Sequence, residues 1–175
     1  IPKIPYKEQD AYSITGWFKS QLRLEADLQK AGRQVLFSDK GGHLVLGLEK
    51  NQLVLELNNG SETAEASASD EIAYDTVTGG EVRPAWNHFA IIKDGGAFKV
   101  YLNGSEVISM ELPDTELSGT LCVGARQVEG GKANYFNGLV DEIHFYSAAL
   151  EKSSVQDLYE ALPLNKGSET NVALN

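Results

Sequence analysis

The stretch WNHFAIIKDGGAFKVYLNGSEV, residues 86–107, decides the fold. Two runs of alternating polar and apolar residues flank the triplet Asp94-Gly95-Gly96. Alternation with a period of two is typical of a half-buried β-strand. The two glycines supply the positive φ angles that a tight reversal needs. The stretch therefore predicts a β-hairpin.

The same alternation recurs in AYSITGWFK (residues 11–19) and in HLVLGLEKNQLVLELNNG (residues 43–60). In the second of these, every other residue is leucine, first at Leu44, Leu46 and Leu48 and then at Leu53, Leu55 and Leu57. TLCVGA (residues 120–125) and GLVDEIHFY (residues 138–146) predict two more strands. Many short strands with few helices predict an all-β sandwich or barrel.

Helical signals are few. EKSSVQDLYEAL (residues 151–162) has an apolar stripe through Val155, Leu158, Tyr159 and Leu162, with Ser153 or Ser154 as the expected N-cap. SQLRLEADLQKA (residues 20–31) is polar and fits one helical turn or a loop. We expect two long loops, at 60–84 (with one or two edge strands) and at 126–138.

Composition excludes several classes of function. The 175 residues fit one domain, and the net charge of −10 argues against nucleic acid and anionic membrane surfaces as partners. The single cysteine, Cys122, allows no internal disulfide. No apolar run approaches the length of about 20 residues that a membrane span needs. No signal peptide is visible at residues 1–10, which fits a cytosolic protein or a fragment of a longer one.

Three segments together are similar to a known family. YSITGWFKS, WNHFAIIKDGGAFKVYLNGSEV and GARQVEGGKANYFNGLVDEIHFYSAALEKSSVQDLY resemble, in order and spacing, the laminin-G-like domains of the concanavalin-A-like lectin/glucanase superfamily. The resemblance spans residues 11–160. It implies a two-sheet antiparallel β-sandwich, a jelly roll, with a short C-terminal helix, and we place this domain at residues 1–163.

The C-terminal tail carries a second resemblance. ETNVALN (residues 169–175) is similar to the opening of a discoidin-like (factor 5/8-type) module, and the polar segment NKGSE precedes it. Residues 164–175 are then a linker leading to a following module. The combination implies a secreted or cell-surface, multidomain bacterial protein that degrades glycans, with neighbouring domains of the same chain as partners.

The carboxylates do not suggest catalysis. Jelly-roll hydrolases of the superfamily carry Glu-x-Asp-x-x-Glu on one strand, which this sequence lacks. Asp141 and Glu142 are adjacent, so an ideal strand would direct them to opposite faces. His43, His88 and His144 lie in alternating segments without zinc-ligand spacing or a nucleophile elbow. We expect no enzyme activity from this domain, although the parent protein would be a glycoside hydrolase.

Laminin-G-like domains often hold a structural Ca²⁺ through carboxylate and carbonyl oxygens. The resemblance therefore makes Asp141 the first candidate ligand and Asp39 the second. The alternative is that Asp141 accepts hydrogen bonds from loop amides and fastens the last strand.

Sugar binding would use planar aromatics and hydrogen-bonding side chains on loops. The segment GARQVEGGKANYF offers Arg126, Gln127, Asn134 and Tyr135, and GRQVLFSDKGG offers Arg33 and Asp39. Arg126 resembles an arginine in a loop of sialic-acid-binding sandwich modules, but their further arginines have no match here. Solvated loop polarity is the alternative for all of these residues. We expect Trp86 in the core and Trp17 on a sheet surface.

These observations predict a monomeric, non-catalytic carbohydrate-binding (lectin-like) module for a terminal sugar or short oligosaccharide. A structural or protein-interaction spacer that supports a catalytic domain is the alternative, and a glycosidase is third.

Overall fold

The hairpin at residues 86–107 forms as the sequence predicts. In the computed structural model, which describes residues 10–21, 32–76, 82–117, 120–128 and 130–161, strand β8 (Asn87–Asp94) pairs antiparallel with β9 (Ala97–Leu102). Gly95 lies at the turn with φ +58°. β9 continues through Asn103 and Gly104, both with positive φ, into β10 (Ser105–Glu111).

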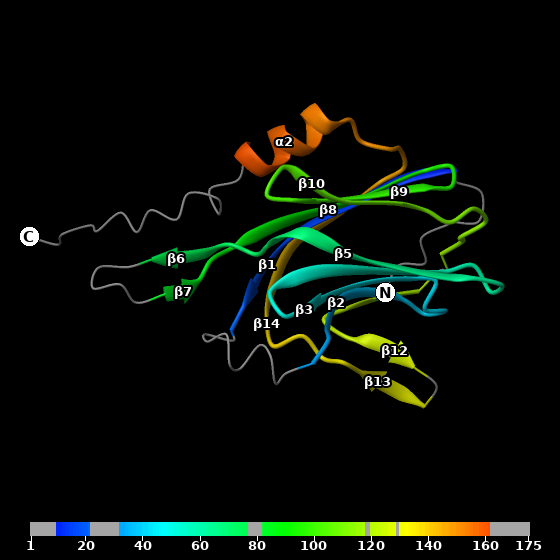
Figure 1. The fold of residues 1–175 in the computed structure, drawn as a ribbon, viewed down its shortest axis with the longest axis horizontal. Coiled ribbons are helices and arrows are strands. Elements are labelled where there is room, and N and C mark those ends of the chain that lie inside the picture. Colours follow the sequence, from blue (N-terminus) through cyan, green and yellow to red (C-terminus); the bar gives the residue numbers. More distant parts are fainter. Residues whose placement is uncertain (1–9, 22–31, 77–81, 118–119, 129, 162–175) are drawn as a thin grey trace, which may run out of the picture.

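Two five-stranded antiparallel sheets make up the body of the molecule (Figure 1). The first, which we call the helix sheet, has the order β10-β9-β8-β1-β14 and adds β1 (Ala11–Ser20) and β14 (Gly138–Tyr146). The second, the arm sheet, has the order β11-β2-β3-β4-β5, with bounds β11 (Leu121–Val123), β2 (Gln34–Asp39), β3 (Leu44–Glu49), β4 (Gln52–Asn58) and β5 (Thr63–Glu71). The expected all-β sandwich is confirmed.

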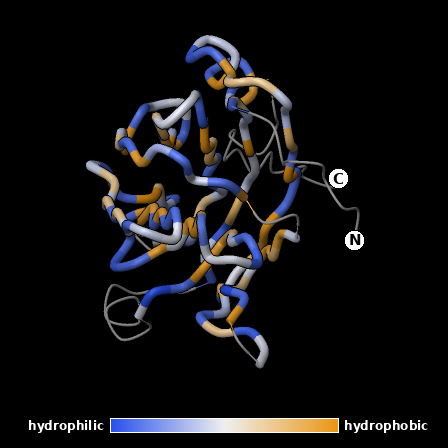
Figure 2. The backbone as a smooth tube through the Cα atoms, turned by 90° about the vertical axis from the view of Figure 1, so that its right-hand side faces the viewer, coloured by the Kyte–Doolittle hydropathy of each residue, from blue (hydrophilic) through white to orange (hydrophobic). Residues whose placement is uncertain are grey.

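The main core lies between the two sheets. The alternating leucines of β3 and β4 are all fully buried there, facing the inward side chains of the helix sheet, among them Ile14, Phe18, Phe89 and Phe98. Figure 2 shows the corresponding alternation of hydrophobic and hydrophilic residues along the strands. Period-2 patterning predicted these faces because successive strand side chains point to opposite sides.

Both expected long loops contain more strand than the sequence suggested. Residues 63–71 form β5, which pairs with β4 along most of its length, and β6 (Tyr74–Thr76) pairs with β7 (Val82–Pro84). Ala64, Ala66 and Ala68 face the core, where small side chains at a sheet edge gave only a weak apolar signal. In residues 126–138, β12 (Arg126–Val128) and β13 (Gly131–Ala133) form a projecting hairpin, which we call the arm.

Helix α2 (Lys152–Ala161) covers the outer face of the helix sheet (Figure 1). It begins upstream of Ser153 and Ser154, so neither serine is its N-cap. Val155 is fully buried against Ala90, Ile92 and Tyr101, forming a second, small core. The expected helix is therefore confirmed, and its packing makes both faces of the central strands apolar.

The burial of both tryptophans differs from the expectation: Trp17 is fully buried, and Trp86 is only partly buried. Trp17 does point out of the main core, but α2 covers it completely, and its ring stacks on Tyr159 with 5.9 Å between centroids. Trp86 precedes β8 and is only partly buried, so its expected place in the core is wrong. Sequence alternation alone cannot detect a helix that covers the second face of a sheet.

A β-bulge in β14 overturns the prediction for Asp141 and Glu142. The pairing with β1 shifts between Thr15 and Trp17, and Glu142 adopts φ +51°. Val140 and Ile143 both pack against the core, which leaves Asp141 and Glu142 together on the outer, solvent side. An extra residue in one strand breaks the period of two, and single-sequence patterning does not reveal it.

The polar segment at residues 22–31 and the tail at residues 162–175, including the expected linker, lie outside the described residues. None of the helical structure in the described ranges has the length and apolar character needed to cross a membrane.

Candidate functional site

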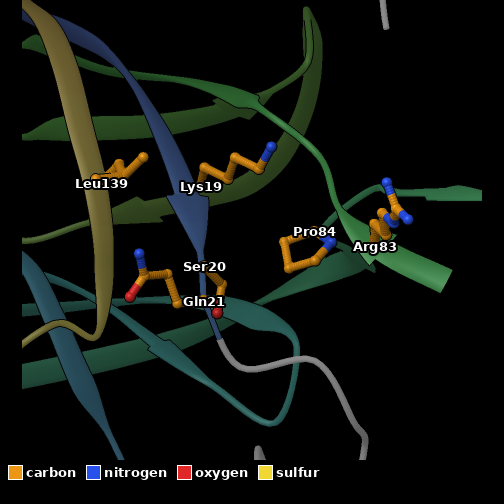
Figure 3. Close-up of a pocket in the computed structure, with 6 residues that line it drawn as sticks. All are labelled: Lys19, Ser20, Gln21, Arg83, Pro84 and Leu139. Carbon is orange, nitrogen blue, oxygen red and sulfur yellow. The ribbon is translucent and has the colours of Figure 1, made fainter. Parts of the chain in front are cut away.

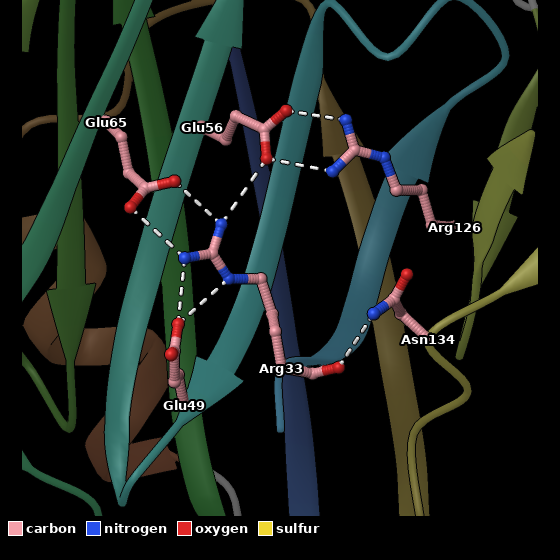
Figure 4. A network of polar contacts seen from close by, with 6 residues as sticks. All are labelled: Arg33, Glu49, Glu56, Glu65, Arg126 and Asn134. Atoms are coloured by element: carbon pink, nitrogen blue, oxygen red, sulfur yellow. Dashed lines mark hydrogen bonds and ion pairs between the residues drawn. The ribbon is translucent and has the colours of Figure 1, made fainter. Parts of the chain in front are cut away.

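The outer face of the arm sheet carries a cluster of charged side chains (Figure 4). Glu49, Glu56 and Glu65 come from β3, β4 and β5, on the positions that alternate with the core leucines and alanines. Arg33 precedes β2, and Arg126 begins β12 of the arm. We call these five residues the network face.

Arg33 is the centre of the network face. Its Nε and Nη2 donate to Glu49 Oε2 at 3.1 and 2.8 Å, and its Nη1 and Nη2 donate to the two oxygens of Glu65 at 2.7 and 3.1 Å. The side chain crosses β3 at Gly47, where a Cβ would lie 3.2 Å from Arg33 Cγ. Gly47 thus lets the guanidinium reach carboxylates on two further strands.

Arg126 connects the arm to the sheet. Its Nη1 and Nη2 donate to the two oxygens of Glu56 at 2.9 and 2.5 Å, a bidentate pair that fixes both planes. Glu56 Oε2 also lies 3.4 Å from Arg33 Nη1, so the two guanidiniums share one carboxylate. The five side chains therefore form one continuous array across three strands and the arm.

Hydrogen bonds of both backbone and side-chain groups attach the arm, and Asn134 after it, to the arm sheet. The side-chain amide of Asn134 donates to the carbonyl oxygen of Arg33 at 3.1 Å, and Val35 N–H donates to the carbonyl oxygen of Asn134 at 2.8 Å. Gln127 N–H donates to the hydroxyl of Ser38, and its side chain bonds Gly131 within the arm. Tyr135 follows Asn134 and is 64% exposed. The chain thus carries an exposed aromatic residue directly after Asn134, which bonds the backbone of Arg33.

At the network face, the pKa values of Arg33 and Glu65 are shifted toward their charged forms. The hydrogen bond to Glu65 holds the pKa of Arg33 above its ordinary value, and the same bond from Arg33 is the main cause of the lowered pKa of Glu65. The side chains are only partly exposed, from 19% for Glu56 to 49% for Glu65. Counting three carboxylates and two guanidiniums, the face has a net charge of −1 and presents preorganised donors and acceptors.

Asp39 has a structural role in the turn between β2 and β3. It is fully buried, and its carboxylate accepts hydrogen bonds from the backbone N–H groups of Gly41 and Leu44 and contacts His43 Nδ1 at 2.8 Å. Its position fixes the β2–β3 turn, with His43 in that turn and not in a strand. Of the six predicted sugar-binding residues, the structure therefore brings together Arg33, Arg126, Gln127, Asn134 and Tyr135.

Asp141 is exposed on β14, and its Oδ1 accepts a hydrogen bond from Glu142 N–H at 2.9 Å. That contact agrees with the local structural role that was the alternative to a metal ligand. Within the described ranges no three His, Cys, Asp or Glu side chains are grouped so that they could hold a metal ion. The Ca²⁺ expectation stays a prediction.

The three glutamates of the network face were not among the residues predicted from the sequence. Glu56 lies between two core leucines, and Glu65 between two core alanines, so each outward position could have been identified. The pairing could not, because Arg126 and Glu56 are 70 residues apart and meet only when the arm folds over the sheet.

A second feature is a cleft of about 420 Å³ where β1, β7 and β14 meet (Figure 3). The residues that line it are Lys19, Ser20, Gln21, Arg83, Pro84 and Leu139. It lies outside the network face and shares no residue with it.

These sheets, the covering helix and the polar outer face define a jelly-roll sandwich of the lectin type. The family profile of the concanavalin A-like lectin/glucanases superfamily matches residues 2–156, and the chain belongs to this superfamily. The expected resemblance is confirmed, whereas no match tests the discoidin-like tail. Comparison with curated protein sequences gives no significant match.

Solved structures share the fold at low sequence identity. A candidate carbohydrate binding protein from Bacteroides ovatus is 13% identical with a TM-score of 0.64, covering 88% of this chain and 42% of its own. The binding domain of botulinum neurotoxin DC, solved in complex with rat synaptotagmin II, is 13% identical with a TM-score of 0.62 and coverages of 87% and 36%. The SAP-like pentraxin of Limulus polyphemus is 18% identical with a TM-score of 0.63 and coverages of 90% and 73%. This chain thus spans less than half the length of the first two.

Proposed function

We propose that this domain is a non-catalytic carbohydrate-binding module and that its ligand is a neutral sugar bound at the network face beside Tyr135. The observation that carries the proposal is the preorganised array of three carboxylates and two guanidiniums on a rigid sheet. Sugar hydroxyls are both donors and acceptors, so such an array can bond vicinal hydroxyls with little reorganisation. Tyr135 offers a planar surface for the apolar face of a sugar ring.

The charges favour an uncharged ligand over a carboxylated one. Arg33 and Arg126 already bond the carboxylates of Glu49, Glu56 and Glu65. A sugar carboxylate would have to displace one of these glutamates and leave it without its partner, which is costly for a partly buried charge. A sialic-acid ligand, which the loop position of Arg126 had suggested, is therefore not our proposal for this face.

The test is a glycan array followed by calorimetry with Tyr135→Ala. We expect neutral oligosaccharides as hits, with Kd values of about 10–100 μM or weaker because little apolar area is buried. Tyr135→Ala should weaken binding by roughly tenfold, or about 1.4 kcal/mol, because the aromatic platform is lost. Val123→Ala, at an exposed position on β11 of the arm sheet, is the matched control and should bind as the wild type.

An array without any hit would contradict the carbohydrate-binding function. Binding that Tyr135→Ala leaves unchanged would instead contradict the assigned site.

A protein-interaction module is the second candidate. Three large apolar or aromatic side chains are exposed in this part of the chain: Val123 on β11, Val128 in the arm and Tyr135 just after it. The wider context, a secreted multidomain protein that degrades glycans, is part of the proposal and rests on the resemblance of the C-terminal tail. The gain in affinity through neighbouring modules would then come from avidity.

A further inference from the structure

The cleft at the end of the helix sheet has walls that are fixed by backbone contacts. Lys19 and Leu139 are cross-strand partners on β1 and β14, and Gln21 N–H donates to the carbonyl oxygen of Asn137 at 2.9 Å. In Figure 3, Leu139 and Lys19 lie next to each other on neighbouring strands, with Pro84 and Arg83 on the opposite wall. The volume of about 420 Å³ lies within the usual range for small-ligand sites.

The opposite wall is held by a buried asparagine. Asn87 is fully buried, and its side chain bonds the backbone N–H and carbonyl of Ala73 and the carbonyl of Ala85. These bonds attach both ends of the β6–β7 hairpin to the helix sheet. Arg83 and Pro84 at the end of β7 therefore have a defined position relative to Lys19, as a binding site requires.

The cleft is lined by basic residues although the chain as a whole is acidic. The chain has 25 acidic and 15 basic residues, yet the described residues that line this cleft include two basic and no acidic ones. Lys19 makes no ion pair with the described part of the chain, whereas Arg83 faces its cross-strand partner Asp75 on β6. Lys19 and Arg83, two cations on different strands, both line this one concave site.

The cleft also has an apolar surface. Leu139 is 48% exposed, an unusual state for a large aliphatic side chain on a sheet, and Pro84 lies across from it. A ligand that fits both features has an anionic group for Lys19 and Arg83 and a ring with an apolar face for Leu139 and Pro84. A ring sugar with a carboxylate or sulfate group has this chemistry.

We propose that the cleft lined by Lys19, Arg83 and Leu139 is a second binding site, separate from the network face, for an acidic sugar. The choice of a sugar among ring-bearing anions rests on the proposed carbohydrate-binding function, but the anion site does not. The two sites then bind different classes of ligand: the network face binds neutral sugar units, and the cleft binds acidic ones.

The experiment is calorimetry of the whole chain with two matched pairs of probes. Methyl glucuronide is compared with methyl glucoside, and galactose 6-sulfate with galactose, so that each pair differs only in the anionic group. We expect each acidic probe to bind at least about tenfold tighter than its neutral partner. Raising the ionic strength from about 0.01 M to about 1 M should weaken the acidic probes, because the Debye length falls from about 30 Å to about 3 Å.

Three variants locate the binding. Lys19→Gln and Leu139→Ser, both at partly or largely exposed positions, should each weaken the acidic probe by about threefold to tenfold, and Lys19→Gln with Arg83→Gln should abolish its binding. Lys152→Gln removes one positive charge at the start of α2 and is the matched control, expected to have no effect. Tyr135→Ala should also leave the acidic probe unaffected.

Equal affinity for acidic and neutral probes, or unchanged binding in the Lys19→Gln, Arg83→Gln double variant, would overturn the proposal. Inorganic sulfate that binds as tightly as galactose 6-sulfate would overturn the sugar assignment. Acidic-probe binding that Tyr135→Ala removes would place the anion at the network face and not in the cleft. A failure of neutral sugars alone would contradict the proposed function and leave the anion site standing.

Discussion

The role of a single residue in this domain depends on the groups that surround it. Arg33 and Arg126 were candidates for sugar binding because free guanidiniums suit carboxylates, yet in the fold both are already bonded to glutamates. In the proposed function, the same residues therefore form a hydroxyl-binding array and not a receptor for anions. The proposed anion site uses Lys19 and Arg83, which sequence reasoning did not single out.

His88 is the residue whose titration should affect folding most clearly. It is 1% exposed between Trp17 and Tyr159, and burial lowers its pKa to about 4. The pKa of His88 in the unfolded chain is near 6.5. The stability that the neutral imidazole contributes to the fold is therefore fully present above that pH and is lost as the pH falls toward 4. By pH 5 the loss should be roughly 2 kcal/mol.

Urea denaturation of wild type and His88→Leu between pH 7.5 and pH 4.5 checks this. The wild type should lose more stability than the variant over this range, and the exposed His144→Gln control should follow the wild type. Parallel pH profiles for wild type and His88→Leu would refute the assigned role of burial.

At the scale of elements, the pairing of β1 with β14 contains a local irregularity. The bulge at Asp141 and Glu142 turns Ile143 into the core opposite Gly16 of β1. A Cβ at Gly16 would contact the tip of the Ile143 side chain and lie 2.9 Å from the Phe89 ring. The absence of a side chain at Gly16 therefore lets the bulged strand pack closely.

Gly16→Ala should destabilise the protein by about 1–3 kcal/mol, because the new methyl group overfills a packed interior. Ile143→Val removes the contacting methyl group, so the cost of Gly16→Ala should be smaller in that background, although the Phe89 contact remains. Chemical denaturation of the four proteins of this double-mutant cycle measures the coupling. The same cost in both backgrounds would show that Ile143 is not the neighbour that excludes a side chain.

For the whole molecule, sequence periodicity predicted what depends on neighbours in the chain. The leucines of β3 and β4, the hairpin at Gly95 and helix α2 follow from local pattern, and all are present. Sequence periodicity did not predict the long-range features. These are the helix over Trp17, the bulge at Glu142 and the ion pairs that join residues 32 and 70 positions apart.

The candidate site follows the same division. Loop composition directed attention to the segment from Arg126 to Tyr135, because polar and aromatic residues concentrate there. It could not predict that this segment folds as an arm against the arm sheet, nor which carboxylates it meets. Charge balance at the network face, which favours a neutral ligand, depends on those contacts alone.

The central claim is that a neutral glycan binds at the network face. The most direct measurement is a titration of the isotopically labelled chain with the strongest neutral array hit, followed by backbone amide NMR shifts. We expect the backbone amides of Lys19 and Leu139 to be unchanged and the largest shifts to occur at Arg33, Glu65, Arg126, Gln127, Asn134 and Tyr135. Shifts confined to other parts of the surface would contradict the proposed site. The lack of any saturable shift over the whole range of glycan concentrations would contradict it as well.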